Sequence, residues 1–167
     1  MSTILGTKEL ELTLEQLQHP NLKKALLQST TVVRDTARNY CPVNHTELKR
    51  SIGMEAKVES DHFRGIVFTN KEYAPYVEFG TGPVGQAMHR GISPDVNPTY
   101  TQDSWWIHES QIDKADAEKY HFFKIETEDG VFYMTDGQAA NPFMYPALVD
   151  SEEIIEDIFE EEVFRTI

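Results

Sequence analysis

The sequence predicts an α+β domain in which an antiparallel β-sheet packs against a long N-terminal helix and a C-terminal helix. Two observations support this prediction. Apolar residues recur at three- and four-residue steps near both ends of the chain, and the segments between them alternate with period two. With 167 residues, the chain is expected to form a single domain, 1–167, that carries a long loop and hairpin insertion at residues 80–135.

The first elements are a short strand and a helix. Residues 8–13, KELELT, alternate as a half-buried strand does, and Thr13 and Gln16 have the spacing of a capping box. A helix of about 20 residues follows His19-Pro20 and ends at Pro42. Its apolar or small stripe consists of Leu22, Ala25, Leu26, Ser29, Val33, Ala37 and Tyr40.

The middle of the chain predicts strands. SIGMEAKVES (51–60) and FRGIVFTN (63–70) read as two strands joined by a polar turn at residues 60–62. YAPYVEF (73–79) reads as a third extended segment, which lies at a sheet edge or enters the sheet only after Pro75, because Pro75 cannot donate a ladder hydrogen bond. Residues 80–104, rich in Gly, Pro, Ser and Asn, predict a long loop.

The last part of the chain predicts a hairpin and a helix. WWIHES (105–110) reads as a strand, and Asp129-Gly130 marks the turn of a hairpin between two further strands. Pro146 suits the first turn of the C-terminal helix. The apolar stripe of that helix is Leu148, Ile154, Ile155, Ile158, Phe159 and Val163. Its opposite face, expected to be solvated, is Asp150, Glu152, Glu153, Glu156, Asp157, Glu160, Glu161 and Glu162.

Charge and composition exclude several classes of function. The net charge is −13, and residues 51–167 hold eight Lys/Arg against twenty-three Asp/Glu, so nucleic acid should be repelled rather than gripped. No apolar run approaches the roughly 18 residues that a membrane span needs, and no secretory signal is visible. The single cysteine, Cys41, suits a reducing cytosol and is expected to be a small buried hydrophobe.

Gly80-x-Gly82-x-x-Gly85 has the spacing of a dinucleotide-binding fingerprint after an apolar run. Such a site needs a helix that opens directly from the loop, and the residues between Gly85 and Pro94 are too few to build one. Pro83 also removes one of the amides that would hold a phosphate. We therefore expect no cofactor, and interpret the glycines as hinges where the chain leaves the core for a flexible arm.

Other catalytic signals are weak. The six histidines show no metal-ligand spacing, and neither a nucleophile elbow nor a phosphate-binding loop is present. A small metal-dependent hydrolase would have to use His108, Glu109, His121 or Asp136. His108 and Glu109 are neighbours in a predicted strand, so they are expected to point to opposite faces. The prediction is a protein without enzymatic activity.

Three stretches, in order, resemble one family. CPVNHTELKRSI (41–52), YAPYVEFGTG (73–82) and GQAANPFMYPAL (137–148) are similar to the signature motifs of the tail-component or minor structural proteins of long-tailed bacteriophages, the gene-product-ten-like family of HK-type phages. The resemblance covers roughly residues 20–165. One departure is Thr46, which stands where the family usually carries glycine. If the turn needs a positive φ there, Thr46 would be strained.

The resemblance implies a structural protein of the phage neck, a tail-completion or head–tail joining protein that forms a ring, often of six copies, around the DNA channel. Its partners would be the head–tail connector or stopper, the tail terminator, the tail tube and further copies of itself. Genomic DNA would pass through without sequence-specific binding, along an acidic wall supplied by the C-terminal helix or by the insertion. The protein would reside at the head–tail interface of the virion, and in the host cytoplasm during assembly.

Two sets of residues carry these expectations. The family-motif and structural residues are Pro42, Leu48, Ser51, Ile52, Tyr73, Tyr76, Glu78, Phe79, Gly80, Thr81, Gly137, Pro142, Phe143 and Pro146. The expected subunit-contact residues of the arm are Trp105, Trp106, Phe122, Phe123 and Tyr133.

Specific roles can be assigned within the first set. Tyr73, Tyr76 and Phe79 are expected to pack the sheet against the first helix. Glu78 either accepts bonds from loop amides or from Arg38 or Arg50, or is a solvated edge charge. Phe143 and Pro146 are expected to anchor the last helix.

Three alternatives remain open at this point. A tail terminator that caps the tail tube would share the same motifs. A metal-dependent hydrolase and an acidic protein that mimics DNA to inhibit host nucleases belong to other classes. The last of these would need carboxylates spaced like phosphates over a broad face.

Overall fold

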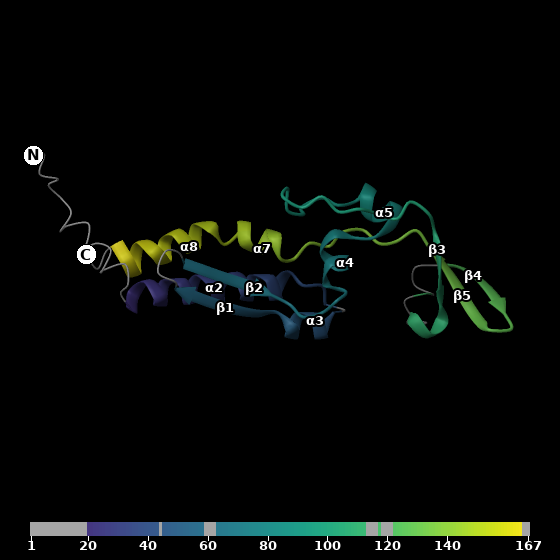
Figure 1. The fold of residues 1–167 in the computed structure, drawn as a ribbon, viewed down its shortest axis with the longest axis horizontal. Coiled ribbons are helices and arrows are strands. Elements are labelled where there is room, and N and C mark those ends of the chain that lie inside the picture. Colours follow the sequence, from purple (N-terminus) through teal and green to yellow (C-terminus); the bar gives the residue numbers. More distant parts are fainter. Residues whose placement is uncertain (1–19, 44, 59–62, 113–116, 118–121, 165–167) are drawn as a thin grey trace, which may run out of the picture. The chain divides into compact units, whose positions relative to one another are not determined.

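The computed structural model describes residues 20–43, 45–58, 63–112, 117 and 122–164 (Figure 1). The chain divides into two compact units: residues 1–71 with 143–167, here called the body, and residues 72–142, here called the arm unit. The predicted insertion, 80–135, lies inside the arm unit. The expectation that the whole chain is one domain stays a prediction.

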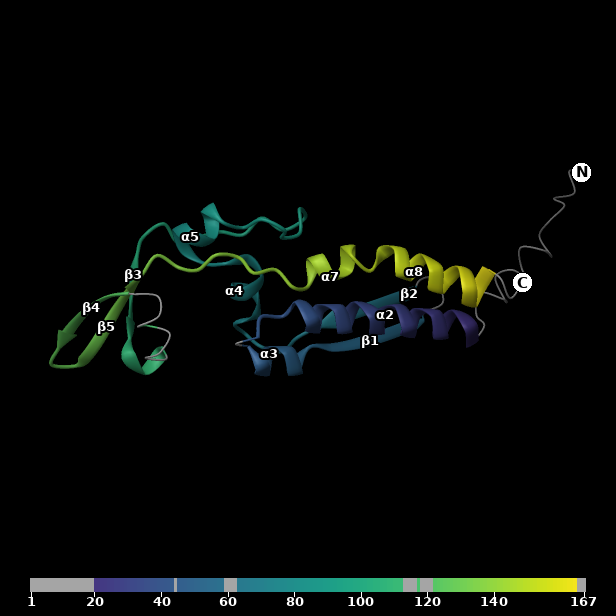
Figure 2. The ribbon, with the colours of Figure 1, turned by 180° about the vertical axis from the view of Figure 1, so that it is seen from behind.

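Helix α2 (Pro20–Tyr40) is the central element of the body. It contacts the strand pair β1–β2 as well as the C-terminal helices α7 and α8, and Figures 1 and 2 show it alongside both. Most of the predicted stripe is buried, with Ala25 and Ala37 fully inaccessible, whereas Tyr40 is exposed. The predicted helix and its apolar face are therefore confirmed, apart from the last residue of the stripe.

Strands β1 (Gly53–Val58) and β2 (Phe63–Phe68) form an antiparallel pair in which Ala56 lies opposite Gly65. The pair crosses α2 where Gly65 meets Thr30, and a Cβ added at Gly65 would collide with the Thr30 hydroxyl. Thr30 itself donates to the Leu26 carbonyl at 2.7 Å. The two predicted strands are confirmed, and their expected turn at residues 60–62 lies outside the described residues.

A short helix, α3 (Thr46–Ser51), links α2 to β1. Leu48 and Ile52 are fully buried there, and the Ser51 hydroxyl donates to the Leu48 carbonyl at 2.8 Å. The same hydroxyl lies 2.6 Å from that of Thr69, just after β2. Thr46 is the first residue of α3 and so has a helical backbone, which needs no glycine.

The predicted C-terminal helix is divided into two. Helix α7 (Tyr145–Val149) has Pro146 in its first turn, as expected, and α8 (Glu152–Phe159) continues into a π-helical turn, η2 (Glu160–Phe164). The break occurs at Ser151, whose buried hydroxyl donates to the Ala147 carbonyl at 2.6 Å. Ile158 and Phe159 pack against Leu22 and Ala25 of α2, whereas Leu148 and Ile154 of the predicted stripe are exposed.

The arm unit begins with a helix where the sequence predicted an extended segment. Residues Ala74–Phe79 form α4, so the prediction of a strand at YAPYVEF is wrong. Pro75 lies in the first helical turn, where a missing amide costs nothing. Gly80 closes the helix with φ +75° and donates its amide to the Tyr76 carbonyl at 3.0 Å.

The rest of the arm unit contains a second short helix and a three-stranded sheet. Helix α5 (Gly82–Ala87) lies within residues 80–104, so the prediction of a loop at those positions is wrong. Strands β3 (Trp105–His108), β4 (Phe123–Thr127) and β5 (Gly130–Thr135) are antiparallel in the order β3-β5-β4, and a 3₁₀ turn, η1 (Glu109–Gln111), follows β3. Thr127 pairs with Gly130, so the hairpin turn is one residue earlier than predicted.

The α+β class is confirmed by helices and antiparallel sheets within the described residues, with a helix near each end of the chain. The short strand and capping box predicted at residues 8–16 lie outside that part of the chain.

Candidate functional site

Two distant stretches of the resembling motifs meet at one place in the arm unit. The Thr81 amide donates to the Gln138 carbonyl at 2.9 Å, and the Gln138 amide donates back to the Thr81 carbonyl at 3.1 Å. Val84 donates to the Asp136 carbonyl at 3.2 Å, and the Gln138 side-chain amide donates to the Tyr76 carbonyl at 2.9 Å. We call this crossing of residues 80–85 with residues 136–138 the glycine clamp.

The clamp leaves no room for a side chain at any of its four glycines, and Gly137 and Gly82 show the closest approaches. Gly137 has φ +95°, and a Cβ there would collide with the carbonyl oxygen of Thr81. Gly82 has φ +61°, and its added Cβ would collide with the Asp136 carbonyl and lie 2.8 Å from the Trp105 ring. Both positions combine a left-handed backbone with close approach of another segment, which only glycine allows.

The glycines thus have a different role from the one expected. They do not form a flexible exit from the core, because the residues around them are tied to residues 136–138 by main-chain hydrogen bonds on both sides. The segment before them is helix α4 and not the strand that a dinucleotide fingerprint requires. The Tyr100 hydroxyl adds a bond of 2.9 Å to the Phe79 carbonyl, and burial raises the pKa of that hydroxyl.

The family-motif residues occupy contrasting environments. Leu48, Ile52 and Phe143 are fully buried. Tyr76 is 58% exposed, so the expectation that it packs the sheet against the first helix is wrong: it lies on the solvent side of α4. Glu78 is buried, which removes the alternative of a solvated edge charge. Gly80 is also buried, and the remaining members, which are partly buried, are Pro42, Ser51, Tyr73, Phe79, Thr81, Gly137, Pro142 and Pro146.

The predicted contact residues of the arm fall on different faces of the three-stranded sheet. Trp106 and Phe123 are both aligned with Met134 of the central strand, so the three share one face. Trp105 and Tyr133 belong to the opposite face, and Phe122 precedes β4. The other apolar members of the first face, Ile125, Phe132 and Met134, were not among the predicted contact residues, although their period-two spacing within the strands indicates them.

His108 and Glu109 do not point apart, as a continuous strand would require, because β3 ends at His108 and η1 begins at Glu109. His108 Nε2 lies 3.1 Å from the Asp129 carbonyl, and Glu109 accepts from the Val131 amide at 3.1 Å. Both side chains therefore fasten the hairpin. Within the described residues, no group of three or more His, Cys, Asp or Glu could hold a metal ion, and His121 lies outside them.

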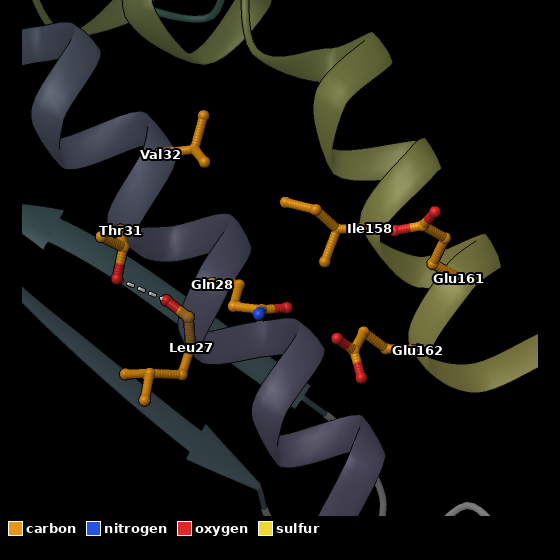
Figure 3. A pocket seen from close by; sticks show the side chains of 7 residues that line it. All are labelled: Leu27, Gln28, Thr31, Val32, Ile158, Glu161 and Glu162. Carbon is orange, nitrogen blue, oxygen red and sulfur yellow. Dashed lines mark hydrogen bonds between the residues drawn. The ribbon is translucent and has the colours of Figure 1, made fainter. Parts of the chain in front are cut away.

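The body contains an open groove between α2 and the C-terminal helix, with a volume of about 470 Å³ (Figure 3). Its lining residues are Leu27, Gln28, Thr31, Val32, Ile158, Glu161 and Glu162. Lys24 forms an ion pair of 2.7 Å with Glu162. The groove combines an apolar floor with carboxylates and brings together no nucleophile and base.

The outward face of α8 is strongly acidic. Glu152, Glu153, Glu156 and Asp157 are exposed along this helix, and Glu160 and Glu161 continue the series into η2. Basic side chains are absent from α8, and Glu162 is the member that pairs with Lys24. The predicted acidic face therefore exists as a surface of the body.

Comparison with known proteins gives a match to a family model. The family model described as "Bacteriophage HK97-gp10, putative tail-component" matches residues 8–80. This range contains the first resembling stretch, 41–52, and most of the second, but not the third at 137–148. No curated protein and no solved structure shows significant similarity to the chain. None of the described helices is long and apolar enough to cross a membrane.

The matched range corresponds to α2, α3, β1, β2 and α4, together with the preceding residues. The residue signatures at 41–52 and 73–80 and this independent match agree with one another. Over residues 8–80, the chain is similar to the HK97-gp10-like family of bacteriophage tail components.

Proposed function

We propose that the protein is a structural component of the phage neck, a tail-completion or head–tail joining protein that assembles as a ring around the DNA channel. The observation that carries the proposal is the match of residues 8–80 to a tail-component family. Those residues supply most of the helix-and-strand core of the body. The proposed role is non-enzymatic, and it places the protein at the head–tail interface of the virion, after assembly in the host cytoplasm.

The two-unit construction supports a role in assembly. The body has a buried core around α2, which a subunit of a ring needs in order to hold its shape. The arm unit adds a folded sheet held by main-chain bonds at the glycine clamp. A subunit with a rigid body and a second rigid unit can contact several neighbours at once, including further copies, the connector or stopper, and the tail tube or its terminator.

The acidic face of α8 suits a surface along which DNA slides without being bound. Its exposed carboxylates, such as Glu153, Glu156 and Asp157, would repel phosphates and let the duplex slide. We propose that this face, in a ring often of six copies, lines the channel. Neutralisation of these three residues to Gln, Gln and Asn should then slow DNA ejection without preventing assembly of the virion.

A tail terminator is the second candidate, because the description of the matched family names the tail without naming the level of the tail at which its members act. Deletion of the encoding gene separates the two roles. Loss of a joining protein should leave filled heads and finished tails of normal length unjoined. Loss of a terminator should instead give tail tubes of uncontrolled length, because their growth would not be capped. Normal virions after deletion would overturn both.

A further inference from the structure

One face of the arm sheet carries only apolar and neutral side chains. The register aligns Trp106 with Met134 and Phe123 on the three strands, and it aligns His108 with Phe132 and Ile125 in the next row. Aligned residues of antiparallel strands share a face. No Asp, Glu, Lys or Arg belongs to this face within β3, β4 and β5, all of which the structure describes. We call the six aligned residues, Trp106, His108, Phe123, Ile125, Phe132 and Met134, the arm face.

The aromatic side chains of the arm face form two cross-strand pairs. The ring centroids of Trp106 and Phe123 are 6.0 Å apart, and those of His108 and Phe132 are 5.1 Å apart in an edge arrangement. Such pairs stabilise the sheet, and they also hold a flat apolar surface in one arrangement. The opposite face differs, since Lys124 and Glu126 form an ion pair of 3.3 Å there.

The arm face remains open to solvent. Phe123 is 61% exposed and Trp106 is 43% exposed, so the two rings leave on the order of 200 Å² of apolar surface in water. Ile125 is exposed next to them. A contiguous apolar patch on the surface of a folded domain is often functional, even where its size is ordinary for a soluble protein. It is smaller than the roughly 800 Å² per partner of a stable isolated complex, so it suits one contact among several.

The charge around the arm face indicates which partner fits. Within the described part of residues 103–136, six Asp/Glu stand against one Lys, and the exposed acids include Asp103 and Asp129 near the ends of the strands. A second copy would bring the same negative charge to the contact, which opposes association. A protein with an apolar centre and a rim of Lys or Arg would be attracted instead.

We propose that the arm face docks a different protein, whose contact surface is apolar at its centre and basic at its rim. This inference rests on the proposed function, which identifies the candidate partners as the other structural proteins of the same virion. Contacts between copies in the ring are then made by other surfaces. The arm unit is thereby assigned to attachment of the ring to its neighbours, not to closure of the ring.

Site-specific photo-cross-linking tests the proposal. A photoreactive phenylalanine analogue is placed at Phe123 in the full chain, in cells that produce the phage, and the cross-linked product is identified by mass spectrometry. The matched control carries the same analogue at Lys124, which is adjacent and exposed but belongs to the opposite face. We expect Phe123 to cross-link one other virion protein, at a segment flanked by Lys or Arg, with at least about tenfold higher yield than Lys124.

Three results would overturn it: cross-linking of Phe123 chiefly to a second copy, equal yields from both positions, or no product in assembled particles. A second variant guards against a misfolded probe. Phe123→Asp should lower co-purification of the cross-linked partner about tenfold, while Lys124→Asp should leave it nearly unchanged. Both variants should keep the circular dichroism spectrum of the wild type, which shows that they fold. If particles lacking the protein show unjoined heads and tails while the Phe123 test fails, the neck function stands and only the arm face is wrong.

Discussion

At the scale of single residues, the glycine clamp is the least tolerant part of the described chain. A Cβ at Gly137 would collide with the Thr81 carbonyl, and the φ of +95° is itself unfavourable for any other residue. Thr81 and Gln138, which are 57 positions apart in the sequence, can therefore lie in contact only if the positions beside them carry no side chain.

Substitution of Gly137 by Ala should open the clamp. Gly91→Ala is the matched control, because Gly91 also has a positive φ, +80°, but an added Cβ would meet only a Pro142 side-chain atom at 3.3 Å. Strain of the backbone alone costs about 1–3 kcal/mol in both variants. We expect Gly137→Ala to lose more stability than Gly91→Ala in urea, and to lose hydrogen-exchange protection at the Thr81 and Gln138 amides. Equal losses would show that the close approach is unimportant.

Cys41 makes stability depend on pH in the alkaline range. It is 3% exposed, and burial raises the pKa of its thiol, so the folded state keeps the proton that the unfolded chain gives up near pH 8.5. Its contribution is complete below that pH and is lost as the pH rises through the folded pKa. Between pH 7.5 and 9.5, the free energy of unfolding measured in urea should therefore fall more steeply for the wild type than for Cys41→Ala. The difference in slope should be at most about 1.4 kcal/mol per pH unit. Parallel curves would contradict the assignment.

At the scale of elements, β2 meets α2 at a close approach between Gly65 and Thr30. Gly65 passes over Thr30 so closely that an added Cβ would collide with the hydroxyl, whereas the Thr30 Cβ would lie at an ordinary 3.4 Å. The interference therefore comes from the atoms beyond the Thr30 Cβ. Removal of those atoms should make room for an alanine on the strand.

A double-mutant cycle measures this contact. Gly65→Ala alone should destabilise the protein by about 1–3 kcal/mol through overpacking. In the Thr30→Ala background the same change should cost much less, so the coupling energy from urea unfolding should lie within about 0.5–3 kcal/mol. Additive losses would mean that the strand does not cross the helix at these two residues.

Elements defined by local pattern were predictable from the sequence. The stripe from Leu22 to Ala37 predicts α2, and the alternation of residues 53–58 and 63–68 predicts β1 and β2. YAPYVEF failed because a short apolar run with a proline fits an edge strand and a first helical turn equally well. The helix is decided by Gly80, whose positive φ ends α4 and directs the chain into the clamp.

Features that depend on pairing between distant segments were not predictable. The clamp requires Thr81 to meet Gln138, and the arm face requires β3 to pair with β5 instead of β4. Neither pairing leaves a periodic signal along the chain. The aromatic residues of the arm were recognised from composition, but their division between two faces became clear only from the register of the three strands.

At the scale of the whole molecule, the net charge is expected to oppose contacts between copies. Each copy carries a net charge of −13, so copies repel one another at low ionic strength. Salt shortens the screening length from about 30 Å at 0.01 M to about 8 Å at 0.15 M. Sedimentation velocity of the purified protein should therefore show smaller species at low salt and more association as salt rises. Association that weakens with salt would indicate attraction between oppositely charged surfaces and would contradict this account.

Cryo-electron microscopy of the mature virion can show whether the protein forms the proposed ring at the junction of head and tail. We expect density that fits the body, with α2 between the strand pair and the C-terminal helices, repeated around the channel between the connector and the tail tube. Density for the body at the tail tip, or absence of the protein from the virion, would contradict the proposed ring.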